Sequence, residues 1–538
     1  MALVTSVTLE SVSYHLPDGS SLFTDLDLQI DQRRTGLVGR NGVGKSLLAR
    51  LIAGHISPSA GRCTRSGTVY YLAQHVSPEP GHTVADLAGV QPVISALERI
   101  EQGNTEQADF DCIGERWGIR QQLLDHLAQN NLAHLTPSTP ASALSGGEAM
   151  RVALMGAFLS QADLLILDEP TNHLDHQHRR ALHEQLLNWP NGLLVISHDR
   201  DLLENMEVIV ELSSTGLTRY GGGFSFYTQA KAEQLRAAQQ QLASVKLERK
   251  RQEQALREQK ERLERSQSRG HKQASDANQA KVLLGRQKER SQASSGKFRV
   301  QQDAVRKQLS AQVRLAASQV EEQQAIFVYP PQACQSAPMQ IAELINARLP
   351  QGAEHLRSIN LTLTRGQRIA LVGPNGCGKS TLLKVLAGQL AVVSGQARTF
   401  VTTAYLDQHL SLLKPEQSVL EQLQALNRQL NEGELRTRLA QLGLNADRVN
   451  QPCNRLSGGE RLKAAMACVF YAASPPQLLL LDEPANHLDL ASVQALESML
   501  KQYSGTLIVT SHDEVFLTAI GVTHRLEASP TGWLITPQ

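Results

Sequence analysis

The chain has 538 residues, too many for one ordinary hydrophobic core, so two or more domains are expected. Hydrophobic residues make up 41% of the chain, enough for well-packed domains, and its formal net charge is only +1. Its six cysteines stand far apart with no CxxC pair, which argues against a zinc site, an iron–sulfur cluster or a disulfide framework and suits a reducing compartment.

The N-terminal stretch "MALVTSVTLESVSYHL" lacks a basic start followed by an apolar run, so it does not predict a signal peptide. Further along the chain, no run of about 18 apolar residues occurs, and no membrane helix is predicted. We therefore expect a cytoplasmic protein.

Two segments of the chain carry the same motifs in the same order. Such self-similarity indicates duplicated units, and we predict two copies of one α/β domain, over residues 1–227 and 329–538. The matched segments are "GLVGRNGVGKS" (36–46) with "ALVGPNGCGKS" (370–380), "LSGGE" (144–148 and 456–460), "DEPTNHLD" (168–175) with "DEPANHLD" (482–489), and "LVISHD" (194–199) with "IVTSHD" (508–513).

Each copy contains the pattern GxxxxGK[ST] between an apolar strand and a leucine-rich helix. Its glycines let backbone N–H groups surround a phosphate, while the start of the helix adds positive potential. Lys45 and Lys379 are expected to neutralise β- and γ-phosphate charge, and Ser46 and Ser380 to ligate Mg²⁺. The residues assigned to the two phosphate loops are Gly39, Asn41, Gly42, Gly44, Lys45 and Ser46 in the first copy and Gly373, Asn375, Gly376, Gly378, Lys379, Ser380 and Thr381 in the second.

Two carboxylates follow an apolar strand in each copy, within "LLILDEP" and "LLLLDEP". Asp168 and Asp482 stand at the expected carboxyl ends of these strands, where they can hold a metal ion through water. Glu169 and Glu483 come next and are placed to orient or deprotonate the water that attacks the γ-phosphate. We expect these two glutamates to be catalytic.

Histidine and glutamine also recur at fixed offsets. His198 and His512 lie 30 positions after the two aspartates, at the ends of apolar strands, and are predicted to contact the γ-phosphate as part of the catalytic set. Gln74 and Gln408 lie 29 positions after the phosphate-loop lysines and suit a loop that senses the metal and the attacking water. The candidate Mg²⁺ ligands are Ser46, Gln74 and Asp168 in the first copy and Ser380, Gln408 and Asp482 in the second.

The two copies differ in length between the glutamine and "LSGGE". Gln74 lies 71 positions before Ser145, whereas Gln408 lies only 49 positions before Ser457. The first copy thus has about 22 extra residues, which the leucine spacing predicts to be helical and which fall near 91–130. Sequence alone leaves two interpretations, a longer helical subdomain or a short functional arm.

Residues 228–328, between the copies, contain no proline and hold 21 Lys/Arg and 11 Asp/Glu, a net charge of +10, whereas the rest of the chain has −9. Apolar residues at helical spacing, interrupted by Arg249, predict two long helices that fold back as a hairpin with a polar tip near 266–298. A helix over 228–265 would span roughly 55 Å. This basic hairpin indicates a polyanionic partner, with a merely solvated helix as the alternative. The apolar residues are Leu235, Leu242, Leu256 and Leu263 in the first helix and Val305, Leu309, Val313, Ala316 and Val320 in the second.

This set of motifs resembles the ATP-binding cassette (ABC) ATPases, and "LSGGE" is its decisive member because other P-loop enzymes lack it. In that family two cassettes pair head to tail, and LSGGE of one closes over the nucleotide on the phosphate loop of the other. The resemblance implies an ATP site (site 1) closed by Ser457 and Gly459 and another (site 2) closed by Ser145 and Gly147. The other residues of site 1 would be Lys45, Ser46, Gln74, Asp168, Glu169 and His198, and those of site 2 would be Lys379, Ser380, Gln408, Asp482, Glu483 and His512. Asp175 and Asp489 would link the two sites.

The two sites are not identical in sequence. Tyr14 is expected to stack on adenine in site 1, where the second copy has Ala347. Leu47 replaces the second hydroxyl that usually follows the phosphate-loop lysine, and Ala485 stands in place of Thr171. We predict that the sites differ in nucleotide affinity or turnover but that both hydrolyse ATP, because both catalytic glutamates are present.

The tandem cassettes, the helical linker and "DEPTNHLD" together resemble the ABC-F subfamily, of the bacterial type. The resemblance implies that the ATP-closed form binds the ribosomal E site and that the linker contacts P-site tRNA and the rRNA of the peptidyl-transferase region. It further implies a monomer whose cassettes pair within the chain, acting as a translation factor or protecting the ribosome from antibiotics.

Three alternatives stay open. A mechanoenzyme acting on DNA or recombination intermediates would use the same basic hairpin, because basic helices do not distinguish rRNA from DNA. The ATPase pair of a transporter would need membrane domains, which this sequence does not contain. A non-enzymatic scaffold is disfavoured by the presence of Glu169 and Glu483.

Overall fold

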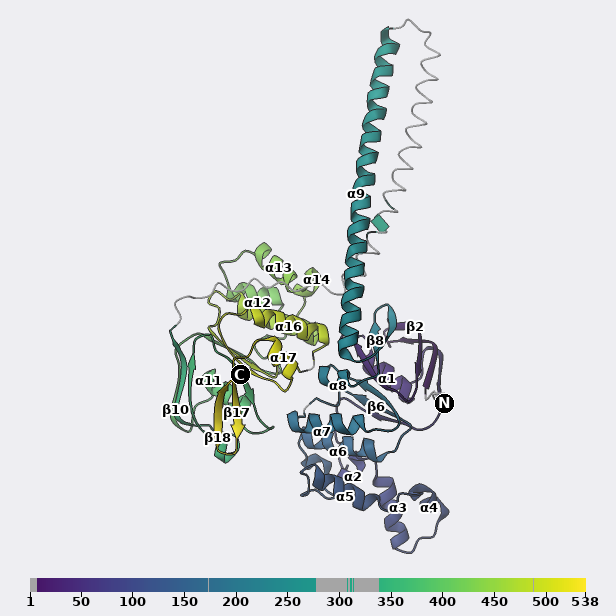
Figure 1. The fold of residues 1–538 in the computed structure, drawn as a ribbon, viewed down its shortest axis with the longest axis vertical. Coiled ribbons are helices and arrows are strands. Elements are labelled where there is room, and N and C mark those ends of the chain that lie inside the picture. The colour runs from purple at the N-terminus through teal and green to yellow at the C-terminus, as the bar shows by residue number, and fades with distance from the viewer. Residues whose placement is uncertain are drawn as a thin grey trace. The chain divides into compact units, whose positions relative to one another are not determined.

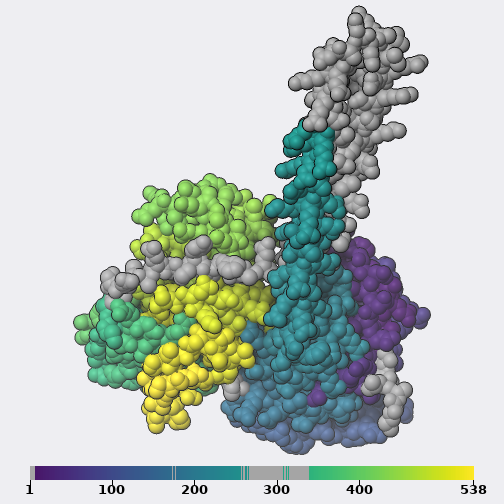
Figure 2. All heavy atoms as spheres, turned by 45° about the horizontal axis from the view of Figure 1, so that its top comes forward, coloured from purple at the N-terminus to yellow at the C-terminus, as the bar shows by residue number. Residues whose placement is uncertain are grey.

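The computed structural model describes residues 7–172, 174–276, 338–486 and 488–538, together with 307, 310, 311 and 313; the remainder is drawn in grey in Figures 1 and 2. Met1–Tyr227 and Ile326–Gln538 form one compact unit, and Thr228–Ala325 forms another. The first unit contains two cassettes with the same order of strands, which differ mainly in the helices between β5 and α6 and between β14 and α15 (Figure 1); this confirms the predicted tandem α/β repeat.

The central sheet of the first cassette has six strands in the order β5-β6-β7-β3-β8-β9. All neighbours are parallel except β8 and β9. Both faces of β6 and β7 are buried, as the unbroken Leu, Ile and Val runs of parallel strands predict. The strands are β3 (Arg34–Gly39), β5 (Val69–Leu72), β6 (Leu164–Asp168), β7 (Gly192–Ile196), β8 (Val208–Ser213) and β9 (Gly216–Gly221).

The second cassette repeats this sheet in the order β14-β15-β16-β12-β17-β18. Each cassette adds a three-stranded antiparallel sheet, β2-β1-β4 in the first and β11-β10-β13 in the second. The strands are β1 (Val7–His15), β2 (Ser21–Ile30), β4 (Ala60–Arg65), β10 (Gln340–Arg348), β11 (Ser358–Thr364), β12 (Arg368–Val372), β13 (Ser394–Thr399), β14 (Thr403–Leu406), β15 (Leu478–Asp482), β16 (Thr506–Thr510), β17 (His524–Ser529) and β18 (Gly532–Pro537).

Helices complete each cassette. Those that start at sequence motifs are α1 (Lys45–Ala53) and α11 (Lys379–Leu386) after the phosphate loops, α6 (Gly146–Leu159) and α15 (Gly458–Phe470) after "LSGGE", and α7 (His176–Leu187) and α16 (Leu490–Gln502) after "NHLD". The others are α2 (Val84–Leu87), α3 (Gln91–Glu101), α4 (Gln107–Ile113), α5 (Ile119–Gln129), α8 (Arg200–Glu204), α12 (Val419–Leu426), α13 (Glu432–Gln441), α14 (Ala446–Val449) and α17 (Glu514–Ala519), with short 3₁₀ turns at Ala141–Ala143, Glu354–Leu356 and Cys453–Arg455.

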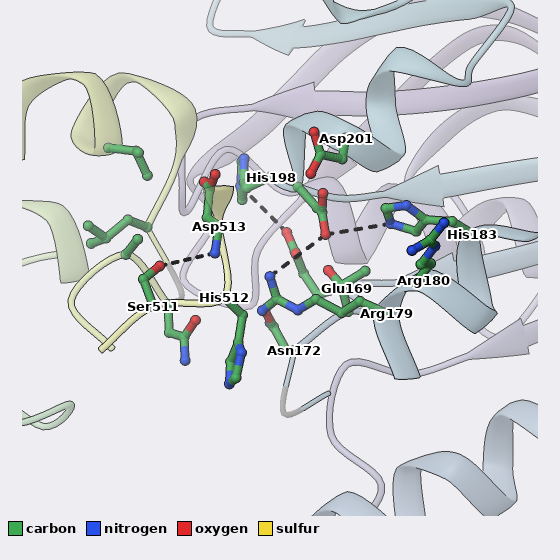
Figure 3. A pocket seen from close by; sticks show the side chains of 16 residues that line it. Glu169, Asn172, Arg179, Arg180, His183, His198, Asp201, Ser511, His512 and Asp513 are labelled. Atoms are coloured by element: carbon green, nitrogen blue, oxygen red, sulfur yellow. Dashed lines mark hydrogen bonds and ion pairs between the residues drawn. The ribbon is translucent and has the colours of Figure 1, made fainter. Parts of the chain in front are cut away.

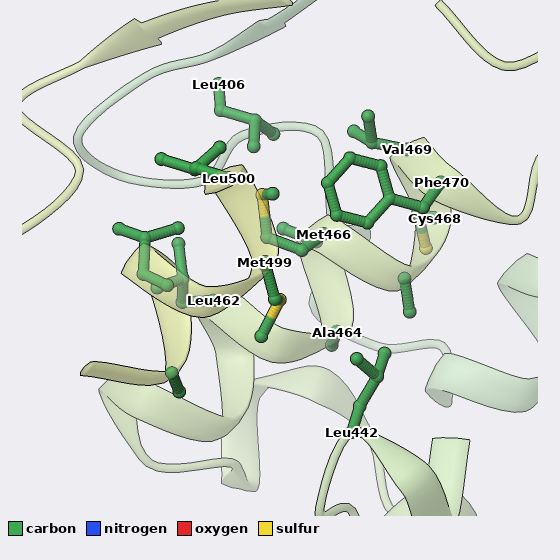
Figure 4. Packing of buried hydrophobic residues seen from close by; sticks show 14 of the residues in the cluster. Leu406, Leu442, Leu462, Ala464, Met466, Cys468, Val469, Phe470, Met499 and Leu500 are labelled. Carbon is green, nitrogen blue, oxygen red and sulfur yellow. The ribbon is translucent and has the colours of Figure 1, made fainter. Parts of the chain in front are cut away.

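The core of the second cassette joins α15 to α16. Leu462, Met466 and Phe470 of α15 are buried in one cluster with Met499 and Leu500 of α16 (Figure 4). Burial of side chains of this size contributes about 1.5–3 kcal/mol each. The helix that starts at "LSGGE" and the helix that starts at Asp489 are therefore held together as one body.

The helix α9 (Phe224–Asp276) leads out of the first cassette and has 53 residues, so it is roughly 80 Å long. Leu235, Leu242 and Arg249 lie on a half-buried stripe seven residues apart, and Arg249 Nε donates to Glu253 Oε1 at 2.8 Å. The helix continues past residue 265, where the sequence predicted the polar tip to begin, because the single Gly270 costs only about 1 kcal/mol among good helix formers. The predicted second helix and the tip beyond Asp276 lie outside the described residues, apart from 307, 310, 311 and 313.

The first turn of α9 is fixed to α8. The backbone N–H and the hydroxyl of Ser225 both donate to Glu204 Oε2, at 2.8 and 3.0 Å. The backbones also approach closely, since a Cβ on Gly223 would lie 2.3 Å from the carbonyl oxygen of Glu204. In the part of the chain that the structure describes, neither α9 nor any other helix is long and apolar enough to cross a membrane.

Candidate active site

The two phosphate loops have the same geometry. Lys45 Nζ donates to the carbonyl oxygens of Gly39 at 2.7 Å and Arg40 at 3.1 Å, and Lys379 Nζ makes the matching bonds at 2.7 and 3.1 Å to Gly373 and Pro374. Burial lowers the pKa of Lys45, although Glu169, Asp489 and Asp168 raise it in part. Each lysine is therefore held inside its loop, as a phosphate site requires.

Glycines give the loops their shape. Gly44 and Gly378 cap α1 and α11 with left-handed φ values of 103° and 109°. Gly42 and Gly376 have φ values of 81° and 78°, and a Cβ at either position would meet nothing within 4 Å. The outer side of each loop is thus open, and the helix start beneath it can receive an anion.

Asp168 and Asp482 end β6 and β15, as predicted from sequence. Burial raises the pKa of Asp168, and hydrogen bonds from Ser46 and Tyr71 offset this only in part. Asp168 Oδ1 is buried and has no hydrogen-bond partner among the described residues. A carboxylate oxygen left open beside the Ser46 hydroxyl fits a hard cation such as Mg²⁺.

Two tyrosines hold these aspartates, and sequence reasoning missed them. The Tyr71 hydroxyl donates to Asp168 Oδ2 at 3.2 Å, and the Tyr405 hydroxyl donates to Asp482 Oδ2 at 3.1 Å. Burial raises the pKa of both phenols, and the adjacent carboxylates raise it further. Both tyrosines stand three positions before the predicted glutamine, so the repeat itself carried a signal for them.

Thr510 makes the two acidic sites differ. Its hydroxyl donates to Asp482 Oδ1 at 2.8 Å and accepts from the backbone N–H of Glu483 at 2.7 Å. The first cassette has Ile196 at the corresponding strand end, where the N–H of Glu169 donates to the backbone carbonyl oxygen of Ile196 at 2.8 Å. Asp482 Oδ1 therefore has a threonine hydroxyl as its partner, whereas Asp168 Oδ1 has no hydrogen-bond partner among the described residues.

The two predicted catalytic glutamates have the same unusual backbone. Glu169 and Glu483 have φ values of 50° and 48°, in the left-handed region that non-glycine residues rarely adopt. Burial raises the pKa of Glu169 to about 8 and that of Glu483 to about 7, while Lys45 and Lys379 respectively oppose the rise. Carboxylates with pKa values near neutrality suit general-base chemistry.

A histidine faces each glutamate. His198 Nε2 lies 3.6 Å from Glu169 Oε1, and His512 Nε2 lies 3.4 Å from Glu483 Oε1. Burial, and after it the charge of Lys45, lowers the pKa of His198 to about 3, so its imidazole is neutral at physiological pH. A neutral imidazole can donate one hydrogen bond to a phosphate oxygen.

The remaining predicted residues lie around these groups. Gln74 is half-buried after β5, whereas Gln408 is exposed after β14. Tyr14 is half-buried on β1 with its ring centroid 6.1 Å from that of Phe23, and Ala347 is fully buried at the matching place. Adenine stacking and metal binding by these residues stay predictions.

The two "LSGGE" loops start helices. Ser145 and Ser457 are exposed N-caps of α6 and α15, and each accepts a hydrogen bond from the backbone N–H of the glutamate three residues later. Gly459 packs closely, since a Cβ there would lie 2.2 Å from Ser492 Oγ. Gly147 is half-buried at the same place in α6. Each exposed helix start offers N–H groups to an anion.

The aspartates of "NHLD" differ in their partners. Asp489 Oδ1 accepts from the N–H of Ser492 at 2.9 Å, and its Oδ2 accepts from the N–H of Asn41 in the first cassette at 3.0 Å. Asp175 Oδ1 instead accepts from the N–H of His178 at 3.0 Å and lies 2.6 Å from Nδ1 of the same histidine. The predicted link across the two cassettes is thus direct for Asp489, while Asp175 is held by its own helix.

A cavity of about 350 Å³ lies between the two histidine loops (Figure 3). Glu169 and His198 of the first cassette and His512 of the second line it. Arg179 of α7 and Val493, at the same position in α16, also line it. The two cassettes therefore contribute chemically different side chains to the cavity at this position.

Residues 23–172 and 356–486 match the family model described as ABC transporter. The probable ATP-binding protein YheS of Escherichia coli (strain K12) is 32% identical over 501 residues, which cover 90% of this chain and 73% of YheS. The tylosin resistance ATP-binding protein TlrC of Streptomyces fradiae is 31% identical over 513 residues, 89% of each chain.

A solved structure has the same fold. The archaeal ribosome recycling factor aABCE1, in a crystal structure of its complex with the archaeal ribosomal stalk protein aP1, aligns with a TM-score of 0.58 over 98% of this chain and 90% of that chain. At 18% identity this likeness shows the arrangement of two tandem cassettes alone.

Proposed function

This chain belongs to the ABC-F subfamily of ATP-binding cassette ATPases and hydrolyses ATP, and from this premise we propose that it binds the ribosome in its ATP-closed form. Its place there is the E site, with the linker against P-site tRNA and rRNA of the peptidyl-transferase region. It works as a translation factor or as an antibiotic ribosomal protection protein. YheS and TlrC, which align over most of this chain, support the proposal.

The observation that carries the proposal is α9. One uninterrupted helix of 53 residues leads out of the first cassette and holds 12 Lys/Arg against 7 Asp/Glu. Such a helix is long enough to reach deep into a groove and carries the positive charge that RNA backbones attract. TlrC is named for tylosin resistance, which makes ribosome protection the first of the two roles to examine.

The chemistry proposed for each site follows from its geometry. Glu169 or Glu483 orients the attacking water and accepts its proton, and the neutral imidazole of His198 donates a hydrogen bond to the γ-phosphate. Ser46, Gln74 and Asp168 would hold Mg²⁺ in site 1, and Ser380, Gln408 and Asp482 would hold it in site 2. The ion, when bound, offsets negative charge on the phosphate oxygens.

One experiment tests the proposal directly. The double variant Glu169→Gln, Glu483→Gln should trap ATP without hydrolysing it, and in a sucrose gradient of cell lysate with ATP it should sediment with ribosomes. A matched control adds Lys45→Ala and Lys379→Ala, which removes nucleotide binding and should return the protein to the top of the gradient. If the trapped protein stays out of the ribosome fractions, and co-purifies with DNA instead, the proposal is wrong and the DNA mechanoenzyme replaces it.

A second experiment divides the two roles. Overexpression of the intact chain should raise the tylosin concentration that cells survive if the protein protects ribosomes from this drug. The Glu169→Gln, Glu483→Gln variant, expressed to the same level, is the control for hydrolysis. Unchanged tylosin survival with intact ribosome binding would assign the chain to the translation-factor role.

A further inference from the structure

The helix α8 carries a charged residue directly after the histidine loop of site 1. Asp199 caps α8 by accepting from the N–H of Leu202 at 3.1 Å, and the next residue is Arg200. The Arg200 side chain is only 8% exposed, and its Nη1 donates to Glu497 Oε1 of α16 at 2.7 Å. The pair therefore joins the histidine loop of the first cassette to the second cassette.

The negatively charged partner of the Arg200 guanidinium comes from the second cassette. Among the described residues, its Nε and Nη2 have no hydrogen-bond partner, and its guanidinium lies 6.0 Å from the ring centroid of Phe224. The nearby Asp513 also belongs to the second cassette; burial raises the pKa of Asp513 and Arg200 partly offsets the rise. A buried cation with one ion-pair partner is strongly destabilised when that partner is removed.

The helix α16 contacts site 1 at two points. At its start Asp489 accepts from the N–H of Asn41 in the phosphate loop, and eight residues later Glu497 binds Arg200 beside His198. One rigid helix thus spans from the phosphate loop to the histidine loop of the same site.

Site 2 lacks the corresponding pair. The positions equivalent to Arg200 and Glu497 are Glu514 and His183. Glu514 pairs with Arg525 of its own cassette, and His183 Nε2 lies 3.8 Å from Asp199 of its own cassette. The ion pair between cassettes is therefore one-sided, although the rest of the motif set is duplicated.

We propose that Arg200 is a positioning residue for ATP hydrolysis in site 1, because its ion pair with Glu497 holds the His198 loop against α16. Hydrolysis in site 2 does not depend on this pair. The inference rests on the assignment of Glu169 and His198 under Proposed function, and its test therefore has one readout that does not use activity.

The first readout is steady-state hydrolysis by each site alone. In a Glu483→Gln background, where site 1 is active, Arg200→Met and Glu497→Gln should each lower kcat at least tenfold with KM changed less than twofold. In a Glu169→Gln background the same substitutions should change kcat less than twofold. Exchange of the charges, Arg200→Glu with Glu497→Arg, should restore most of the loss, and Arg436→Met, which removes an ion pair with Glu432 inside α13, should have no effect.

The second readout is the imidazole resonance of His198 in selectively labelled protein without nucleotide. Glu497→Gln should shift the His198 signal and leave that of His512 in place, and the exchanged pair should return it. Equal effects on both sites, or an unmoved His198 signal, would overturn the proposal. If Glu497→Gln shifts the His198 signal as expected but the Glu483→Gln protein hydrolyses no ATP, the catalytic role of Glu169 is refuted. The contact of Arg200 with Glu497 would then still be shown to position the His198 loop.

Discussion

Asp489 Oδ2 accepts a hydrogen bond of 3.0 Å from the backbone N–H of Asn41, 448 positions earlier in the chain. The other oxygen of the same carboxylate caps α16, so one side chain both starts a helix and reaches the phosphate loop of the other cassette. Burial raises the pKa of Asp489, but the hydrogen bonds from Ser492 and Asn41 bring it below its usual range. The carboxylate is thus ionised when it meets the loop.

The two tasks of Asp489 can be separated by substitution. We expect Asp489→Ala to weaken ATP binding by site 1 about tenfold, since a hydrogen bond to a charged group contributes about 1.5–3 kcal/mol, and to lose about 1 kcal/mol of stability with the cap. Asp489→Ser keeps a good cap but is too short to reach Asn41. It should lose affinity and keep stability, as measured by nucleotide titration and thermal unfolding; equal affinity for wild type and Asp489→Ser would contradict the contact.

The tyrosines that hold the aspartates should differ in importance. Tyr71→Phe leaves Asp168 without its phenol donor, and we expect Mg²⁺-dependent ATP affinity of site 1 to fall about tenfold. Tyr405→Phe should cost site 2 less, because Thr510 still donates to Asp482. Nucleotide titrations with and without Mg²⁺ measure both, and Tyr405→Phe combined with Thr510→Ile should match the effect of Tyr71→Phe. An equal loss from the two single variants would show that Thr510 does not compensate.

Stability should depend on pH through the catalytic glutamates. The pKa of Glu169 is raised from 4.5 to about 8 in the fold, so the fold holds a proton that the unfolded chain releases. Stability from this group is complete below about pH 4.5 and is lost as pH rises through 8, at about 1.4 kcal/mol per pH unit. Glu169→Gln cannot release a proton and therefore avoids this loss of stability. The difference between the thermal midpoints of Glu169→Gln and wild type should increase from pH 5 to pH 8.

Glu483→Gln is the comparison for that measurement. Because the pKa of Glu483 is raised only to about 7, its gain in thermal midpoint should level off about one pH unit lower than the gain of Glu169→Gln. Nucleotide-free protein should be used, so that binding does not add to the midpoints. Superimposable pH curves for the two variants would refute a higher pKa of Glu169 than of Glu483.

The junction of α8 and α9 should tolerate no side chain at Gly223. A Cβ there would lie 2.3 Å from the carbonyl oxygen of Glu204, so Gly223→Ala should cost about 1–3 kcal/mol of stability by overpacking. Gly221→Ala, two positions earlier, meets nothing within 4 Å and is the matched control. Thermal unfolding compares them, and an unchanged midpoint for Gly223→Ala would mean that the junction can move aside.

Much of each site could be predicted because most of its residues follow strands or precede helices within one cassette. The strand–loop–helix pattern places Lys45 and Ser46 at a helix start, and the buried strand β6 ends at Asp168. Parallel strands carry their carboxyl ends to one edge of the sheet, so residues from β3, β6 and β7 had to meet there. A duplicated sequence then doubles each of these inferences.

Other features could not be predicted from single motifs. The pair of Arg200 with Glu497 joins residues 297 positions apart and has no duplicated counterpart that would mark it. Asp489 was expected to link the two sites, but its partner there, the backbone N–H of Asn41, could not be named from the motif. The hydroxyl of Thr510 can donate to Asp482 only because β16 ends beside β15. The sequence predicted a polar tip from residue 266, whereas α9 continues through Gly270 to Asp276, because a single glycine costs a helix only about 1 kcal/mol.

The hydrogen bonds from Ser225 to Glu204 join a very short helix to a very long one. The helix α8 has five residues and is about 7.5 Å long, whereas α9, fixed to its end, is roughly 80 Å long. A rotation that displaces one end of α8 by about 0.5 Å displaces the far end of α9 by about 5 Å if the two turn together. We expect a small movement of α8 beside His198 to be enlarged about tenfold along α9 under this condition.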